Sequence, residues 1–357
     1  METQLSFSYL LANVVLAFQI EVAEIQSLYA AHRIRRNAQQ KEKFLDSSFK
    51  ELIIDPYLLR LENPHIEPGF KDTRCCMTFW GRPPIHVLEL AGAIQQKLKE
   101  VAPDIWLMPQ HRMHITTLEL AFCRTPQEIE EIKETLKPVI PTVASYTYRH
   151  RARLVKPMIS YDLSAFAVSF LPAAGESEVS PAPIPPDNAD VLEQGDRYSY
   201  HHLRRDMWGQ AKAAGITVDS RYIVPSAHIT LGRYLTNKDH ATPEQRKKWV
   251  DAIDEINEWL EREVWRKSDS EFVGEWLVGQ EKGIDVRVGN LWFPDQAHKP
   301  STLTVFVGEK MKHHFLVATG NTTFYFRDVR TPPATDTRRP ITRSRSPQDK
   351  EDTQGGF

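Results

Sequence analysis

The triplet His-Ile-Thr occurs twice in this chain of 357 residues, at 114–116 and at 228–230. Each copy lies at the same place in a repeated order: a helical pattern, a short apolar run, the triplet, a helix beginning at Thr-Pro, and two strand-like runs. A repeat of roughly a hundred residues indicates a duplicated α+β unit, because solenoid repeats span only about 20–50 residues. We therefore predict an α+β fold: a duplicated, two-lobed antiparallel-sheet structure with outer helices and a central cleft.

The first lobe is predicted to cover residues 71–174. The start of its second helix is predicted at Thr125-Pro126-Gln127-Glu128. Thr125 and Glu128 can form a capping box there, and Pro126 suits the first turn. Apolar spacings of three and four residues mark its first helix, and alternating apolar residues mark its strands. The predicted elements are strand 75–80, helix 88–101, strand 105–108, the triplet strand, the capped helix, and strands 149–156 and 160–171.

The second lobe is predicted to cover residues 191–297, after a linker at 175–190 that is acidic and rich in proline. Gly215 is a typical stop for its first helix, and Thr242-Pro243 caps its second. Lys282-Gly283 predicts the turn of a terminal hairpin. The predicted elements are helix 198–214, strand 216–224, the triplet strand, the helix from 242, and a hairpin of 275–279 with 284–294.

Two further segments flank these lobes. Residues 1–70 are predicted to form a long helix over 17–46 followed by a loop, since 53–71 carries three prolines and a glycine. Within 298–357, the runs 302–308 and 314–326 favour strands, and the remainder from 331 is predicted to be a disordered tail. Arginines in that tail could contact RNA or act as a nuclear address, and a plain solvated tail is an equal alternative.

Composition excludes several classes of protein. The net charge of −2 provides no global positive field for long nucleic acid, so a nucleotide or RNA ligand should be short or held locally. Three cysteines without zinc spacing predict free thiols, a reducing compartment (cytosol or nucleus), and neither a metal nor another cofactor. The apolar stretch from Leu10 to Ile20 is shorter than the roughly 20 residues of a membrane span, so we expect no membrane association. We also expect a monomer.

The triplets carry side chains suited to acid–base chemistry on a phosphodiester. In a strand, alternation places His228 and Thr230 on one face and Ile229 on the other, and His114 and Thr116 share a face likewise. Two such strands facing each other would offer two imidazoles as general acid and base near neutral pH, and two hydroxyls for the phosphate oxygens. A single His-x-Thr among 13 histidines is weak, but two at equivalent places in a repeat are specific.

Four further residues are candidate substrate contacts. Tyr222 and Tyr234 flank the second triplet and could stack on a base, although packing in the core or at the rim is the default for a tyrosine. Arg233 could assist phosphate binding, although most arginines lie at the surface. Lys156 could project into the first-lobe cleft.

Over roughly residues 70–297 the chain resembles the two-histidine (2H) phosphoesterase superfamily, and in particular a fungal branch described as RNA ligase/cyclic nucleotide phosphodiesterase-like. The stretches that carry the resemblance are CCMTFWGRPP, IWLMPQHRMHITTLEL, RARLVKPMISYDLSAFAVSFLPAAGE and SAHITLGRY. The resemblance implies a bilobal fold with an open cleft, catalytic His114 and His228, and phosphate-binding Thr116 and Thr230. It also implies 2′,3′-cyclic phosphate or 2′-5′-linked substrates in nucleotides or RNA ends.

Three alternatives to a phosphodiesterase remain open at the level of sequence. The same cleft could bind a nucleotide or an RNA end without turning it over. It could act on a phosphoester that is not a nucleotide, because the sequence does not identify a base-recognition pocket. The long N-terminal helix and the charged tail could instead belong to an interaction scaffold.

Overall fold

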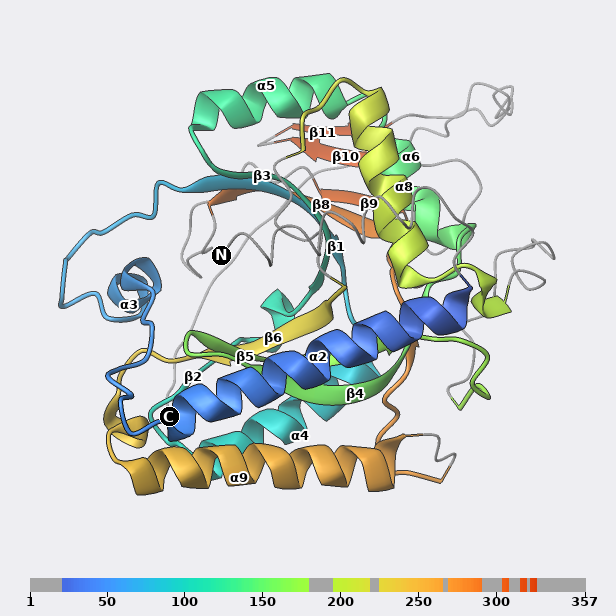
Figure 1. The fold of residues 1–357 in the computed structure, drawn as a ribbon. Helices are drawn as coiled ribbons and strands as arrows, with labels where there is room; N and C mark the ends of the chain where they lie inside the picture. The colour runs from blue at the N-terminus through green and yellow to red at the C-terminus, as the bar shows by residue number, and fades with distance from the viewer. Residues whose placement is uncertain are drawn as a thin grey trace, which may run out of the picture. The chain divides into compact units, whose positions relative to one another are not determined.

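A curled antiparallel sheet of eight strands forms the centre of the fold (Figure 1). The computed structural model describes residues 21–179, 195–218, 225–265 and 269–290, together with the backbone of three short strands between 304 and 325. The sheet has the order β7-β4-β5-β6-β3-β1-β8, and β2 pairs with β6 beside this path. Helices and an antiparallel sheet together confirm the predicted α+β class.

The strands have the following bounds in the structure. In the large sheet they are β1 Cys75–Gly81, β2 Trp106–Leu107, β3 Ile115–Arg124, β4 Arg153–Tyr161, β5 Ala165–Pro172, β6 Ala227–Arg233, β7 Trp276–Leu277 and β8 Ile284–Asn290. A separate three-stranded sheet of order β11-β10-β9 contains β9 Thr304–Val307, β10 Phe315–Thr319 and β11 Thr322–Tyr325. These three strands lie within the two runs predicted near the end of the chain.

The helices begin where the capping signals place them. Thr125 and Glu128 form a reciprocal capping box at the start of α5, and Thr242 and Gln245 form another at the start of α9. The described helices are α2 Val22–Leu45, α3 Pro56–Glu62, α4 Ile85–Val101, α5 Pro126–Leu136, α6 Ile140–Ser145, α8 Tyr200–Ala213 and α9 Pro243–Trp259. A π-helical turn, Leu260–Val264, continues α9.

Two predicted local structures are wrong. The predicted loop at 53–71 contains α3, because the carboxylate of Asp55 accepts hydrogen bonds from the first backbone N–H groups of that helix and Pro56 occupies its first position. The predicted hairpin of 275–279 with 284–294 does not form, since β7 pairs with β4 and β8 pairs with β1.

The strands of the two halves of the chain alternate in the sheet. The hairpin β4–β5 precedes the second triplet by more than fifty residues, yet β5 pairs with β6, which carries that triplet. Strand β8 comes from the second half of the chain, yet it pairs with β1, the neighbour of β3. Among the described strands, β6 therefore pairs with β2, β3 and β5 of the first half of the chain, and β1 of the first half pairs with β8 of the second.

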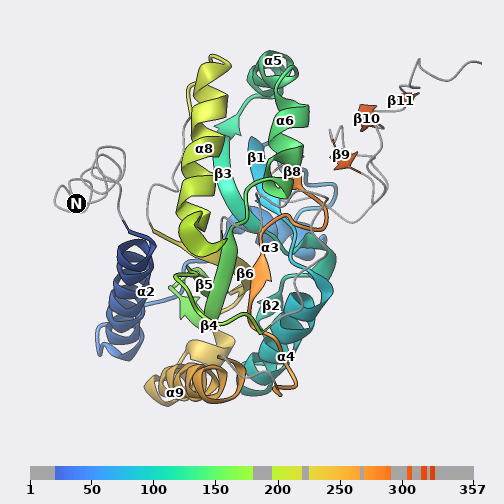
Figure 2. The ribbon, with the colours of Figure 1, turned by 90° about the vertical axis from the view of Figure 1, so that its right-hand side faces the viewer.

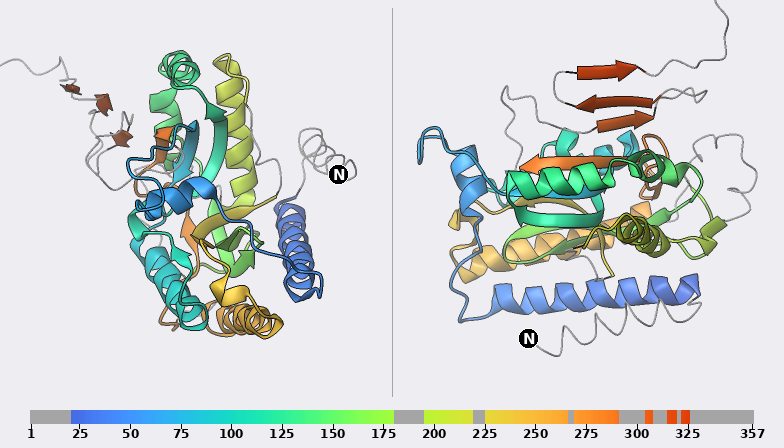
Figure 3. Two further views of the ribbon diagram at one scale, coloured as in Figure 1. Left: turned by 90° about the vertical axis from the view of Figure 1, so that its left-hand side faces the viewer. Right: turned by 90° about the horizontal axis from the view of Figure 1, so that it is seen from above.

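Helices pack against the large sheet (Figure 2). Helices α4 and α9 contact each other and the strands β6 and β4, while α5 and α6 contact β1 and β8 at the other half of the sheet. Helix α8 lies along β3, and α2 lies beside β4 and β5 (Figure 3). None of the helices in the described ranges is both long and apolar enough to cross a membrane.

Candidate functional site

The two His-Ile-Thr triplets meet at the middle of the large sheet. Strands β3 and β6 are antiparallel, and their register pairs Ile115 with Ile229. This register places His114 across from Thr230 and Thr116 across from His228. The two histidines then lie on a diagonal, which in an antiparallel pair separates side chains by about 7–8 Å.

The two faces of the triplets differ in burial as the alternation predicted. Ile115 and Ile229 are buried to 1% and 0% exposure, whereas the histidines and threonines are partly exposed. Ala227 and Leu231 are buried beside Ile229, so the apolar face is held by the core. The imidazoles and hydroxyls are thus presented together on the opposite face of the same sheet.

His114 is fixed by a hydrogen bond and by a stacked ring. Its Nδ1 lies 2.7 Å from the carbonyl oxygen of Arg112. A carbonyl can only accept, so Nδ1 carries the proton and Nε2 is the basic nitrogen of the neutral ring. The indole of Trp80 stacks on the imidazole, with ring centroids 3.6 Å apart and planes within 14°. Burial lowers the pKa of His114 to about 3, the Arg112 carbonyl opposes this, and the charges of Arg82, His228 and Arg287 lower the pKa further.

His228 has different surroundings. Its Nδ1 lies 3.0 Å from the hydroxyl of Ser226, which can donate or accept. Burial lowers the pKa of His228 to about 4, and the nearby charges of Arg204 and Arg233 act in the same direction. The carboxylate of Asp162, in the turn between β4 and β5, acts in the opposite direction. The two triplets are therefore similar in backbone but unequal in electrostatic environment.

Helix α8 brings residues to the triplets that the sequence did not indicate. The hydroxyl of Tyr200 donates to the backbone oxygen of Thr116 at 2.9 Å, and Arg204 Nε donates to the next carbonyl, of Thr117, at 3.3 Å. Arg204 is buried, with 7% exposure, and its charge acts on His228. The guanidinium also hydrogen-bonds the side chain of Tyr29 in α2, so it is held between α2 and β3, close enough for its charge to act on His228. Arg204 stands next to a second arginine, Arg205, in the helix, so only its tertiary contacts distinguish it.

Trp80 is the second functional candidate that sequence reasoning missed. It was predicted as the end of a strand, and β1 indeed carries it there. Its backbone register opposite Thr116 places it on the same face as the histidines. The pairing of β1 with β3 could not be read from local sequence, and the stack depends on that pairing.

The four predicted substrate contacts have different outcomes. Tyr234 is corrected: it is 1% exposed, and its ring packs between Phe166 and Trp249 in the core, so it cannot stack on a base. Lys156 forms an ion pair with Glu176, with Nζ 2.6 Å from Oε1. It also donates a hydrogen bond to the side chain of Gln26 in α2 at 3.1 Å. Arg233 is partly exposed at the end of β6, where its charge acts on His228. Tyr222 lies outside the described residues.

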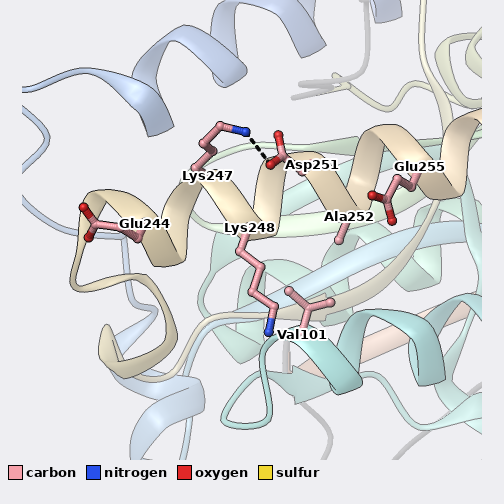
Figure 4. Close-up of a pocket in the computed structure, with 7 residues that line it drawn as sticks. All are labelled: Val101, Glu244, Lys247, Lys248, Asp251, Ala252 and Glu255. Atoms are coloured by element: carbon pink, nitrogen blue, oxygen red, sulfur yellow. Dashed lines mark hydrogen bonds and ion pairs between the residues drawn. The ribbon is translucent and has the colours of Figure 1, made fainter.

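A surface hollow lies between the end of α4 and α9 (Figure 4). Its charged side chains have mixed signs, and Lys247 is paired with Asp251 at 2.5 Å. None of the predicted site residues lines it; the lining residues are Val101, Glu244, Lys247, Lys248, Asp251, Ala252 and Glu255. Within the described ranges, no group of three or more histidines, cysteines or carboxylates is arranged to hold a metal ion.

Comparison with known proteins leaves the family open. No family model matches the chain, and no curated protein matches it. Twelve solved chains match its structure, among them the crystal structure of TT0787 of Thermus thermophilus. That protein is 14% identical, and the match covers 70% of this chain and 97% of that one with a TM-score of 0.29. A likeness at this TM-score bears on neither fold nor function.

Proposed function

We propose that this protein is a metal-independent phosphodiesterase of the two-histidine (2H) type, which hydrolyses 2′,3′-cyclic phosphate or 2′-5′ phosphodiester bonds in nucleotides or RNA ends. The observation that carries the proposal is the antiparallel register of Ile115 with Ile229. It sets two imidazoles and two threonine hydroxyls on one face, within the reach of a single phosphate.

In the proposed reaction, one neutral histidine takes a proton from water while the other, protonated, gives a proton to the leaving ribose oxygen. The hydroxyls of Thr116 and Thr230 donate to the non-bridging phosphate oxygens, and Arg204 adds positive charge from α8. Both imidazoles have a depressed pKa, so the ligand-free pair is neutral at pH 7. A bound phosphate anion favours a proton on one of them, which prepares the general acid.

The topology supports the duplicated, two-lobed arrangement that we propose for this fold. Each triplet strand has the other triplet strand on one side and an antiparallel pair of strands on its other side: β1 and β8 next to β3, and β5 and β4 next to β6. Both halves also place a helix with a Thr-Pro capping box after the triplet. The proposed cleft would lie over the face that bears the histidines.

The proposed substrate is small. With a net charge of −2, the protein has no field to gather a long nucleic acid, so the positive charges that matter are local ones such as Arg204 and Arg233. A mononucleotide or a short RNA end with a 2′,3′-cyclic phosphate meets this condition. We propose that the protein acts as a monomer in the cytosol or nucleus.

The test is a panel of 2′,3′-cyclic nucleotides and of 2′-5′ and 3′-5′ oligonucleotides, with products resolved as 2′- or 3′-phosphates. We expect turnover that persists in EDTA, has a bell-shaped pH dependence, and falls by about 10²–10⁴-fold in His114→Ala and in His228→Ala. His65→Ala, at an exposed position, is the matched control and should retain full activity. Unchanged turnover in both site variants would refute the assignment.

A binding module is the second candidate. The depressed pKa of both histidines favours it, because a pair that stays neutral on binding lacks a general acid. Saturable binding of a 2′,3′-cyclic nucleotide, lost in His228→Ala, with no product between pH 4 and 9, would support this candidate over the enzyme.

A further inference from the structure

The indole of Trp80 lies against one imidazole and two guanidinium groups next to the first triplet. The imidazole of His114 covers one face of the Trp80 indole at 3.6 Å. Two guanidinium groups approach the same indole, with Cζ of Arg82 at 4.9 Å and Cζ of Arg287 at 5.2 Å from its ring centre. The indole is therefore shared between one imidazole and two permanent positive charges.

Hydrogen bonds anchor Arg82 beside the indole, and Arg287 lies near the same carboxylate. Arg82 binds the carboxylate of Asp285 through Nε and Nη2 at 3.0 and 2.9 Å, and Arg287 lies 3.9 Å from the same oxygen. Arg82 Nη1 also donates to the backbone oxygens of His111 and Met113, at 3.2 and 3.3 Å. These contacts fix the backbone of residues 111–113, which directly precede His114.

Burial against the Trp80 indole favours the neutral form of His114, and the charges around the ring favour it further. Two arginines share one carboxylate, so the stack already carries a net positive charge, and an imidazolium would add to it. The groups whose charges act on this histidine from neighbouring elements are Arg82 after β1, Arg287 of β8 and His228 of β6. The carboxylate of Asp285, on β8, lies against both arginines.

His228 has a carboxylate in its surroundings that acts in the opposite sense. Asp162 favours the charged form of His228, and the hydroxyl of Ser226 can accept a hydrogen bond from a protonated ring, whereas Arg204 of α8 and Arg233 at the end of β6 favour the neutral form. The charges that act on His114 are all positive, whereas those that act on His228 include a carboxylate, and this difference distinguishes the two histidines.

We propose that Trp80 is a positioning residue that keeps His114 as the neutral, proton-accepting histidine and leaves His228 as the proton donor. This inference rests on the proposed function. In the corresponding step, Nε2 of His114 takes a proton from water as the water oxygen bonds to phosphorus. The bond from phosphorus to the 2′ or 3′ oxygen breaks, and that oxygen receives the proton of His228. Exchange of one proton with solvent restores both rings.

The experiment follows the titration of each histidine ring by NMR in the full chain, with assignments from His114→Ala and His228→Ala. In Trp80→Leu, which removes the indole, we expect the pKa of His114 to rise by at least one unit toward 6.5 while that of His228 stays unchanged. Trp80→Phe retains a ring for stacking and should keep the pKa of His114 low. Arg287→Gln, which leaves the indole in place, should raise the pKa of His114 by a smaller amount.

Kinetics provide the second readout. With a 2′,3′-cyclic nucleotide, Trp80→Leu should lower kcat about tenfold or more, while KM stays within twofold of the wild-type value. The acid limb of its pH–rate profile should move to higher pH. Trp80→Phe should retain most of the wild-type kcat. An unchanged His114 titration in both Trp80→Leu and Arg287→Gln would overturn the inference, as would an equal shift at His228. If Trp80→Leu does not fold, the titration of His114 in Arg287→Gln tests the inference. If the wild type turns over no phosphodiester, the proposed function fails, and the titrations still test the role of Trp80.

Discussion

The buried His240 should make the stability of the protein depend on pH. Its ring is 1% exposed and packs edge-on against Tyr234 and Trp249, with centroids 5.0 and 5.1 Å apart. Neither ring nitrogen has a hydrogen-bond partner within the described part of the chain. Burial, with a smaller contribution from Arg246, lowers the pKa of His240 to about 4. In the folded protein the ring therefore resists protonation.

The sign of the effect follows from linkage. The unfolded chain binds a proton at His240 near pH 6.5, whereas the folded chain does so only near pH 4, so stability falls as the pH drops through this window. Between pH 7.5 and pH 5.0 the loss from this one group is about 2 kcal/mol, since each unit of pKa difference corresponds to about 1.4 kcal/mol. Above pH 7.5 the contribution is constant.

The variant that isolates the effect is His240→Phe, which keeps an aromatic ring and removes the titrating group. Urea unfolding followed by far-UV circular dichroism at pH 7.5 and 5.0 gives the change in unfolding free energy for each protein. The other buried histidines contribute equally to both, so the wild type should lose about 2 kcal/mol more than the variant. An identical loss in both proteins would show that His240 is not held neutral by its surroundings.

Two further predictions concern the site and the sheet around it. Arg204→Gln should reduce turnover of a 2′,3′-cyclic nucleotide at least tenfold, whereas Arg205→Gln, at the exposed neighbouring position, should leave steady-state rates unchanged. Gly232→Ala should destabilise the protein by about 1–3 kcal/mol in thermal or urea unfolding, because the added Cβ would overlap the ring of Phe166 and the backbone oxygen of Trp106; Gly209→Ala, which meets open space in a helix, should not destabilise it.

Local signals in the sequence predicted much of the fold. The capping boxes at Thr125 and Thr242 mark the starts of α5 and α9, because capping depends on residues three positions apart. The alternation of the triplets likewise predicted which face of each strand is buried. Both depend only on neighbours along the chain.

The parts that depend on distant neighbours could not be predicted in this way. The alternation would place Tyr234 on the face of Thr230, but the pairing of β5 with β6 shifts register near Gly232, and Tyr234 follows the end of β6 into the core. The space left by Gly232 is filled by Phe166, not by a ligand. The stack of Trp80 on His114 similarly depends on the pairing of β1 with β3. Register is set by the whole sheet, so these contacts have no local signature.

The pairing of β1 with β8 has a consequence for synthesis of the chain. Cys75 and Asn290 are register partners, although 215 residues separate them. During translation, the edge of β1 that pairs with β8 therefore stays unpaired until nearly the whole described chain has left the ribosome. We expect slow, late closure of the sheet, since pairings between distant segments carry a large entropic cost before they form. Nascent chains stalled before residue 284 should accordingly be protease-sensitive and should depend on chaperones that shield exposed strands.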